Sequence, residues 1–524
     1  METYDYIVAG AGSAGCAVAA RLAESGARVL LLEGGPDNRV PEVQIPAAFA
    51  QLFHSDRDWD YHTEPEPTLG DRSIYQPRAK TLGGCSSMNC MLHVRGSRAD
   101  YDSWTTYGVE GWSWSDVEPY FDKSPLGWRE LPSPDPLSKA FVASAIETGI
   151  EDNPAHRGPN LDGVGLVTTT TRDGRRYDTA TAYLAPLEDN DALTVVTGAL
   201  IDKVLIEDGA AVGVRYLADG RSVDARALRE VVVSGGVFGT PEILQRSGIG
   251  PGEHLRALGI TPVVDLPAIG AHLMDHPMTL MNWEIEGDEV GLFDADDPAY
   301  VEQWVASGTG KLTSNVAEAT AHIRSEPGLP GPDFQIVFVP SYFREHGAQV
   351  YDKPTFTLGQ SYWTPTSTGS VLIASADPAQ HARIRLNMLS DPAEMAAMIR
   401  AIRLSREIVA TGPLATHAGI EISPGVDVES DADLETWIRE NVEHTYHASC
   451  TARMGTGGAL DSELRVRGVA RLRVADTSVF PVIPRSNTNL PAVMVGERCA
   501  DFLLADHAGA QAPARHSEEM VARS

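Results

Sequence analysis

Cysteine is scarce in this sequence, with five residues among 524. So few cannot form the disulfide framework of a secreted scaffold, and none stands in a Cys-x-x-Cys pair of the kind that binds zinc. Positive charge is also in deficit, because 42 Lys and Arg face 72 Asp and Glu, for a formal net charge of −30. Such a charge repels phosphate groups, so we expect neither a nucleic acid nor a membrane as a partner. The low cysteine content favours a reducing, cytoplasmic compartment.

Long apolar runs are absent as well. No stretch approaches the ~20 uninterrupted apolar residues of a transmembrane helix. The apolar segment 6–22 follows Glu2 and Asp5, where a secretory signal carries cationic residues, and glycines interrupt it. What is present is an ordinary globular composition, 43% hydrophobic and 22% charged, in a chain about twice as long as one core can organise. The length therefore predicts two structural units.

The N-terminal segment has the pattern of a nucleotide-binding βαβ unit. Residues 4–9 predict a strand, the small residues 13–25 a helix, and residues 28–32 a second strand. The first turn has G-x-G-x-x-G spacing, which lets the backbone approach a pyrophosphate at a helix N-terminus, and an acid after the second strand can bind a ribose hydroxyl. A tight turn without a ligand is the alternative for these candidates, which are Gly10, Gly12, Ser13, Gly15 and Glu33.

The pattern changes near residue 285. Before it we predict strands at 193–197 and 230–234 and a helix at 241–246; after it we predict strands at 334–339, 370–373 and 382–386 and a helix at 392–411. Short strands between polar turns favour an antiparallel sheet, which we interpret as a substrate-facing unit. Residues 508–524 are small and polar without an apolar period, which predicts a disordered tail.

Three further segments stand out beside the glycine turn, namely Ala-Lys-Thr-Leu-Gly-Gly-Cys-Ser-Ser-Met-Asn at 79–89, Gly-Gly-Val-Phe-Gly-Thr-Pro at 235–241, and His-Ala-Ser at 447–449 with Asn-Thr-Asn-Leu-Pro at 487–491. Together the four segments are similar to the glucose-methanol-choline (GMC) family of FAD-dependent oxidoreductases, and the resemblance extends from residue 6 to residue 504. The resemblance implies an α/β fold, α+β overall, in which an FAD-binding Rossmann-like domain is interleaved with a substrate domain built on an antiparallel sheet with flanking helices. We expect residues 1–130, 175–280 and 445–507 to form the FAD-binding domain and residues 131–174 and 281–444 the substrate-binding domain, before the tail at 508–524.

The resemblance also implies which further residues contact FAD. Two glycines can pass close to the flavin or its pyrophosphate, and hydroxyl and amide side chains can bond polar ring edges. A strand at 197–201 would meet the adenine, and the stretch 473–476 would lie near the ribityl chain. A turn, a buried strand residue or a solvated turn residue is the structural alternative at each place. The implied contacts are Gly83, Gly84, Ser87, Asn89, Ile201, Asp476 and Asn487.

We expect His447 and Asn489 to carry the chemistry. A hydride donor needs a partner that takes its hydroxyl proton, and imidazole titrates near the operating pH, so the family context makes His447 the general base. Asn489 can hold the alcohol oxygen from a neutral donor. A metal site on one helix face, formed by His444, His447 and Cys450, is disfavoured because an active imidazole cannot easily serve both tasks. We therefore predict no metal, and His276 is left outside the catalytic set.

Met88 stands where choline oxidases carry the histidine that bonds covalently to the flavin. A thioether cannot make that bond, so we predict noncovalent FAD. No acid or aromatic cage for a quaternary ammonium group can be identified, which makes choline a poor candidate substrate. Residues 365–370 and 387–392 are most similar to the 5-hydroxymethylfurfural and aryl-alcohol oxidase branch, beside the choline oxidase/dehydrogenase branch, which implies primary alcohols on flat or apolar bodies. Candidate pocket walls, with core packing as the alternative, are Tyr362, Trp363 and Tyr446.

The expected activity is the oxidation of a primary alcohol, aromatic, furanic or aliphatic, to the aldehyde by hydride transfer to flavin N5. The electrons then pass to dioxygen, giving hydrogen peroxide, or to a quinone-type acceptor, and the sequence does not decide between them. The same family scaffold also houses hydroxynitrile lyases and a photodecarboxylase, so a lyase without net alcohol oxidation is the alternative function, and purely structural FAD is a third. We expect a small-molecule alcohol as the partner of a monomer or homodimer.

Overall fold

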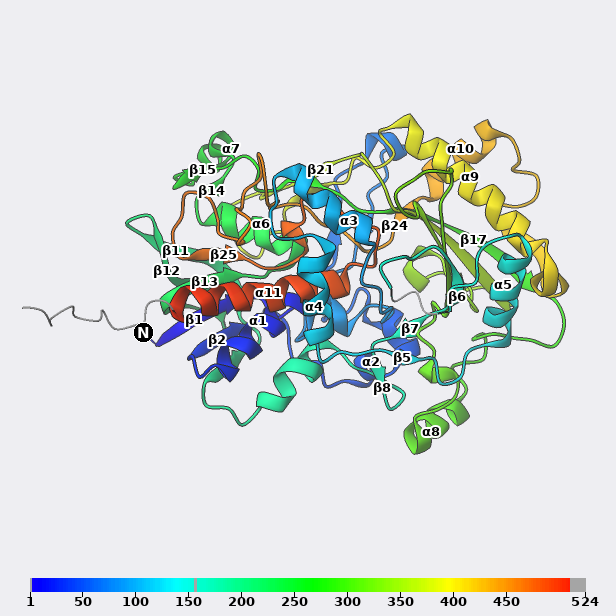
Figure 1. Cartoon of the computed structure of the whole chain (residues 1–524), viewed down its shortest axis with the longest axis horizontal. Helices are drawn as coiled ribbons and strands as arrows, with labels where there is room; N and C mark the ends of the chain where they lie inside the picture. The colour runs from blue at the N-terminus through cyan, green and yellow to red at the C-terminus, as the bar shows by residue number, and fades with distance from the viewer. Residues whose placement is uncertain (1, 155–157, 509–524) are drawn as a thin grey trace, which may run out of the picture.

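The computed structural model describes residues 2–154 and 158–508 and contains two large sheets that lie next to each other (Figure 1). The sheet with the N-terminal strand is on the left of Figure 1, and the second sheet is on the right with its own helices. The predicted tail at 508–524 lies outside the described residues, apart from Ala508, which ends the last helix. Within the described ranges, no helix combines the length and the apolarity that a membrane crossing needs.

The first sheet is built on parallel strands, as the N-terminal pattern predicts. Its strands, in spatial order, are β10 (Leu193–Val196), β2 (Val29–Leu32), β1 (Thr3–Ala9), β13 (Arg221–Val233), β12 (Ala210–Ala218) and β11 (Leu200–Glu207), with β25 (Leu472–Val474) beside β13. The strands β10, β2, β1, β13 and β25 are parallel to their partners, whereas β12 and β11 form an antiparallel edge. Every residue of β2 is buried, which matches its unbroken apolar sequence.

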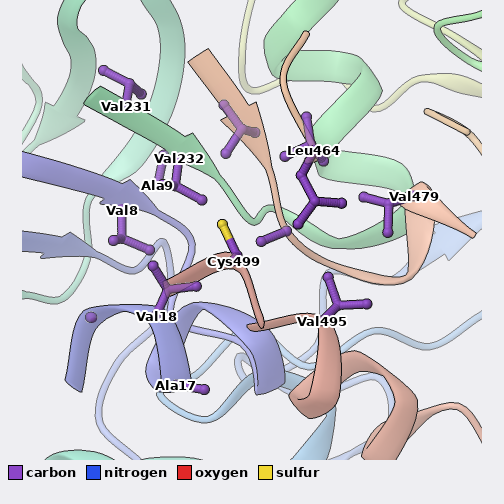
Figure 2. Packing of buried hydrophobic residues seen from close by; sticks show 14 of the residues in the cluster. Val8, Ala9, Ala17, Val18, Val231, Val232, Leu464, Val479, Val495 and Cys499 are labelled. Atoms are coloured by element: carbon purple, nitrogen blue, oxygen red, sulfur yellow. The ribbon is translucent and has the colours of Figure 1, made fainter. Parts of the chain in front are cut away.

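Two helices from opposite ends of the chain pack on this sheet. They are α1 (Ser13–Glu24) and α11 (Asn489–Ala508), which lie side by side in Figure 1. Figure 2 shows Val495 and Cys499 of α11 in the same buried cluster as Val8 of β1. The C-terminal segment thereby completes the core of the N-terminal βαβ unit.

The close approach of the two helices depends on a glycine. A Cβ atom at Gly496 would lie 2.4 Å from the carbonyl oxygen of Ala14, so a larger residue would push the helices apart. The sequence did not predict α11. Its first half, from Leu490 to Ala500, is buried on nearly every side, so no amphipathic period marks it as a helix.

The second sheet is antiparallel, as expected for the segment after residue 285, and contains the predicted strand at 334–339, whereas the predicted strands at 370–373 and 382–386 lie in a separate small sheet. Its strands are β23 (Ala418–Ser423), β17 (Pro277–Ile285), β20 (Thr355–Tyr362), β19 (Phe334–Val339), β18 (Ala319–Ile323) and β6 (Gly163–Leu166), with β24 (Glu443–His444) beside β17. Three helices pack on it, namely α5 (Pro136–Glu147), α9 (Pro392–Val409) and α10 (Asp431–Asn441) (Figure 1). The residue numbers at which we expect one unit to pass into the other stay a prediction.

Smaller elements join the two sheets. A small sheet contains β16 (Ala271–Leu273), β21 (Gly369–Leu372) and β22 (Arg383–Arg385), and α6 (Gly236–Arg246) packs beside β11. The helix predicted at 241–246 therefore begins five residues earlier, directly at the glycine turn after β13. The mixed α/β class, with a Rossmann-like sheet and a separate antiparallel sheet, is confirmed.

Candidate active site

One cavity of about 480 Å³ joins the glycine turn after β1 to the C-terminal histidine segment. Its lining includes both predicted catalytic residues and most of the predicted FAD contacts. Residues from both sheets contribute, among them Ile201 of β11 and Gln335 of β19. The cavity is therefore the site at which the two units meet.

The glycine turn offers bare backbone to one part of this cavity. Gly10 has φ of 119°, and a Cβ atom there would lie 2.2 Å from the carbonyl oxygen of Ser234. A Cβ atom at Gly12 would meet no atom within 4 Å, so a ligand can come close to the N-terminus of α1 at this point. Ser13, the first residue of α1, also lines the cavity. This arrangement fits the pyrophosphate of a dinucleotide.

Glu33, directly after β2, occupies the position expected for the ribose contact. Its carboxylate accepts hydrogen bonds from the backbone N–H groups of Ala11 at 3.1 Å and Gly35 at 2.9 Å. Burial raises the pKa of this carboxyl group to about 7, and those backbone bonds oppose the rise. Glu33 also lines the cavity.

The other implied FAD contacts divide into two groups. Gly84, Asn89, Ile201, Asp476 and Asn487 line the cavity, together with Met88. The residues that do not line it are Gly15, Gly83 and Ser87. Gly15 instead allows helix α1 to touch the strand turn, because a Cβ atom there would lie 2.0 Å from the carbonyl oxygen of Gly10. Ser87 donates to the carbonyl oxygen of Leu82 at 2.7 Å, which holds the local turn.

Asp476 holds protein backbone as well as lining the cavity. Its carboxylate accepts from the N–H of Gly236 at 2.9 Å and from the hydroxyl of Thr240 at 2.6 Å. It also accepts from the N–H of Ser478 at 2.8 Å. Asp476 therefore fixes the turn at the start of α6 on the cavity wall.

His447 sits in the cavity wall between two polar partners. Its Nε2 lies 3.0 Å from Nδ2 of Asn487, and its Nδ1 lies 3.0 Å from Nδ1 of His276. Its backbone N–H donates to the carboxylate of Asp275 at 2.9 Å. The imidazole is only 6% exposed, so these contacts determine its orientation.

The structure brings Asn487, rather than Asn489, to His447. The side-chain oxygen of Asn489 instead accepts from the hydroxyl of Ser13 at 2.7 Å, beside the glycine turn. The cause is local, because Asn489 is the first residue of α11 and faces α1, whereas Asn487 precedes the helix. Asn487 thus contacts His447 and Asn489 contacts Ser13, while both line the cavity, and which of the two bonds the substrate stays a prediction.

Burial keeps the imidazole of His447 in its neutral form. The pKa of His447 lies well below its usual value because the ring is buried, and the charges of His276 and Arg78 lower it further. Burial likewise lowers the pKa of His276 to about 3. A neutral imidazole can accept a proton, which is the requirement for a general base at neutral pH.

A row of aromatic side chains that begins at Tyr446 forms one wall of the cavity. Ring centroids are 5.9 Å apart between Tyr446 and Phe53, 5.8 Å between Phe53 and Phe49, and 6.0 Å between Phe49 and Phe343. All four side chains line the cavity, with Val316 and Val339 beside them. This part of the cavity therefore suits an apolar substrate body.

Two of the three candidate pocket walls lie elsewhere. Tyr446 lines the cavity, but Tyr362 and Trp363 do not. Trp363 is fully buried, and its ring centroid lies 6.0 Å from that of His276 and 4.7 Å from that of His322, so it packs against these two histidines. Tyr362 is the last residue of β20, and its ring packs against that of Phe334 in β19.

The segment 444–450 is not a helix. His444 belongs to β24, and positive φ values of 64° at Tyr446 and 75° at Cys450 bend the chain. His444 bonds the carbonyl oxygen of Tyr75 through Nε2 at 2.8 Å. The spacing that would place three ligands on one helix face therefore does not apply.

Sequence analysis missed two polar residues of the site. His276 contacts His447 directly although it was left outside the catalytic set, and Gln335 donates to Asn487 at 3.3 Å. One signal was present for Gln335, because it is the single polar residue in the apolar run Phe334–Val339 of β19. An uncompensated polar side chain in such a strand indicates a buried hydrogen-bond partner.

Comparison with known proteins identifies the family. Models of the GMC oxidoreductase family match residues 4–278 and 365–496. The chain is 36% identical over 538 residues to an oxygen-dependent choline dehydrogenase of Vibrio vulnificus (strain YJ016), with 96% of this chain and 95% of the relative covered. It is 37% identical to the enzyme of the same name from Rhizobium johnstonii, with 98% and 97% covered.

Solved structures show the same fold. Formate oxidase of Aspergillus oryzae RIB40 superposes with a TM-score of 0.92 at 26% identity, over 97% of this chain and 99% of that chain. Pyridoxine 4-oxidase from Mesorbium loti gives a TM-score of 0.87 at 26% identity, over 95% and 98%. The chain is a member of the GMC oxidoreductase family.

Proposed function

We propose that this protein oxidises the hydroxyl group of a neutral primary alcohol to an aldehyde, with FAD held in the cavity. The observation that carries the proposal is the 3.0 Å contact between Nε2 of His447 and Nδ2 of Asn487 on the cavity wall. Those two atoms offer one proton acceptor and one hydrogen-bond donor to the same small group. An alcohol hydroxyl that displaces this contact can donate to Nε2 of His447 and accept from Nδ2 of Asn487.

Each residue then has a defined task. Bound FAD supplies the acceptor for the hydride. His447 takes the hydroxyl proton on Nε2, and Asn487 donates to the oxygen as negative charge develops on it. The glycine turn with Ser13 and Asn489 holds the pyrophosphate end, and Glu33 binds a ribose hydroxyl. The lyase alternative has no support from the relatives or the solved structures, which bear the names of dehydrogenases and oxidases.

Anaerobic spectroscopy of the purified yellow protein tests this function. Benzyl alcohol or 5-hydroxymethylfurfural is expected to bleach the visible flavin absorbance, because the alcohol delivers a hydride. Admission of air then separates the acceptors that we propose, since rapid recovery indicates dioxygen and slow recovery a quinone-type acceptor. A flavin that stays oxidised with every alcohol tested would contradict the proposal and favour a lyase.

The charge of the site predicts selection against cationic alcohols. Among described lining residues, the carboxylates are those of Glu33, Glu242 and Asp476, and each already accepts protein hydrogen bonds. The guanidinium of Arg78 lies beside the catalytic segment and donates to the carbonyl oxygen of Tyr446 at 3.2 Å. A cation in the cavity would therefore meet the positive charge of Arg78 and no free carboxylate, and among the described lining residues only the aromatic wall would attract it.

We accordingly expect kcat/KM for benzyl alcohol to exceed that for choline by about 10²-fold or more, given that an unpaired charge costs several kcal/mol in a desolvated site. The neutral analogue 3,3-dimethyl-1-butanol is the matched control, because it has the shape of choline without the charge. Similar values for choline and its neutral analogue would show that charge is not selected.

FAD is proposed to be bound without a covalent link. Met88 is buried and lines the cavity, and its thioether has no proton to lose, so it cannot form the neutral bond to the flavin that a histidine forms. The neighbouring Cys90 thiol also lines the cavity, but burial raises its pKa to about 12, so it stays protonated. Precipitation with trichloroacetic acid is expected to release all yellow colour into the supernatant. Colour retained on the washed pellet would contradict this prediction.

A further inference from the structure

Polar side chains form a continuous hydrogen-bonded row behind the catalytic pair. His322 of β18 and Gln335 of β19 are opposite each other in the sheet register. Nε2 of Gln335 lies 3.1 Å from Nε2 of His322 and 3.3 Å from Oδ1 of Asn487, which in turn contacts His447. At the far end, Nδ1 of His322 lies 3.2 Å from the carbonyl oxygen of Leu161.

The backbone carbonyl at the end of this row fixes the direction of each bond. The oxygen of Leu161 can only accept, so Nδ1 of His322 carries a proton and, in the neutral ring, Nε2 of His322 accepts. Gln335 must therefore turn its NH₂ group toward His322. The second N–H of that NH₂ group then faces Asn487 and requires an oxygen there.

The same argument determines which nitrogen of His447 carries the proton. With its oxygen bound to Gln335, Asn487 presents its NH₂ group to His447, so Nε2 of His447 accepts and its proton resides on Nδ1. That proton is donated to Nδ1 of His276 at 3.0 Å. Reversal of the Asn487 amide would instead place an oxygen against Nε2, which would then need to carry the proton and could not act as a base.

We propose that Gln335 is a positioning residue that fixes the amide orientation of Asn487 and thereby keeps Nε2 of His447 unprotonated. This inference rests on the proposed function, in which Nε2 accepts the hydroxyl proton. Gln335 and His322 are both almost completely buried, so water cannot replace their bonds cheaply.

A nearly isosteric substitution of Gln335 reverses the direction of the hydrogen bond between this residue and Asn487. In Gln335→Glu, an ionised carboxylate only accepts, so it draws the NH₂ group of Asn487 toward itself and turns the amide oxygen toward His447. We expect kcat for benzyl alcohol to fall by about 10²-fold, since a wrongly protonated base forfeits proton-transfer catalysis. The acidic limb of the pH–kcat profile is expected to move to higher pH, because the new negative charge favours protonated His447.

Gln360→Glu is the matched control. Gln360 is fully buried on the adjacent strand β20, where its Nε2 donates to Ser405 at 3.0 Å, and it does not line the cavity. The control carries the same change of a buried amide to a carboxylate and is expected to lower the melting temperature without moving the pH limb. An equal shift of the limb in both variants would overturn the proposal.

The tautomer of His447 can be measured by NMR in the holoenzyme without substrate. In ¹⁵N-histidine-labelled holoenzyme, with His447 assigned by its loss in His447→Ala, long-range ¹H–¹⁵N spectra are expected to show a proton on Nδ1 in the wild type and a changed pattern in Gln335→Glu. A wild type that shows this tautomer but is not bleached by any alcohol would refute the proposed function and leave this inference intact. An active wild type with an unchanged kcat and tautomer in Gln335→Glu would refute the inference alone.

Discussion

Replacement of His447 by alanine is expected to lower kcat for the alcohol substrate by about 10²- to 10⁴-fold, or ~3–5 kcal/mol in the activation barrier. The loss is large because Nε2 of this imidazole is the proton acceptor that faces the cavity next to Asn487. Steady-state kinetics with benzyl alcohol and hydride-transfer rates from anaerobic stopped flow measure the change. FAD content, taken from the ratio of visible to ultraviolet absorbance, is expected to stay at the wild-type level.

The dependence of the rate on pH tests the same role of His447. Burial lowers the pKa of His447 well below its usual value, so the base is neutral from pH 8 down to 6.5 and gains a proton only in more acidic solution. The loss of rate that comes from protonation of His447 is therefore expected only below pH 6.5. Asp275, whose pKa burial raises to about 7, bonds the backbone N–H of His447 and can add its own limb. The His447 limb must vanish in His447→Ala, whereas a limb from Asp275 would persist.

An unchanged kcat in His447→Ala would show that His447 is not the base. His444→Ala serves as the control for a buried histidine nearby, since His444 bonds the carbonyl oxygen of Tyr75 and does not line the cavity. A large effect in both variants, accompanied by loss of FAD, would indicate disruption of the fold rather than loss of a base. The prediction therefore requires that the two variants differ in kcat while both retain the flavin.

The N-terminal half of the site could be predicted because its signals are local. A strand, a glycine turn and a small-residue helix follow one another within one short segment, and each has its own sequence pattern. Helix α11 could not be predicted in this way, because burial on almost all sides removes the amphipathic period. Its contact with α1 is a property of the tertiary structure, to which Gly496 contributes no local signal.

The direction in which individual side chains point could not be predicted from the sequence either. Residues two apart, such as Asn487 and Asn489, cannot be assigned to opposite neighbours unless the start of the helix is known. Gln335 carried a signal, as the polar residue of an apolar strand, but its partners come from β18 and from the segment before α11. No spacing rule joins positions so distant in the chain. His447 was predicted as the base only because the family resemblance supplied its context.

Substitution of the two asparagines separately is the second prediction with a large effect. Asn487→Ala is expected to lower kcat by about 10²-fold, because it removes a donor aimed at the developing alkoxide, while FAD stays bound. Asn489→Ala is expected to weaken FAD binding instead, since Asn489 bonds Ser13 beside the glycine turn at the start of α1. Kinetics at saturating FAD and fluorescence titration of released flavin measure the two effects.

The two variants are each other's control, because both shorten an asparagine in one segment and both positions line the same cavity. If added FAD restores the activity of Asn489→Ala but not that of Asn487→Ala, then Asn487, which contacts His447, is the residue that acts on the substrate. The opposite outcome would mean that Asn489 turns toward the substrate when the cavity is filled. In that case the hydrogen bond from Ser13 would have to break on cofactor binding, and Asn487→Ala would lose FAD while keeping its kcat at saturation.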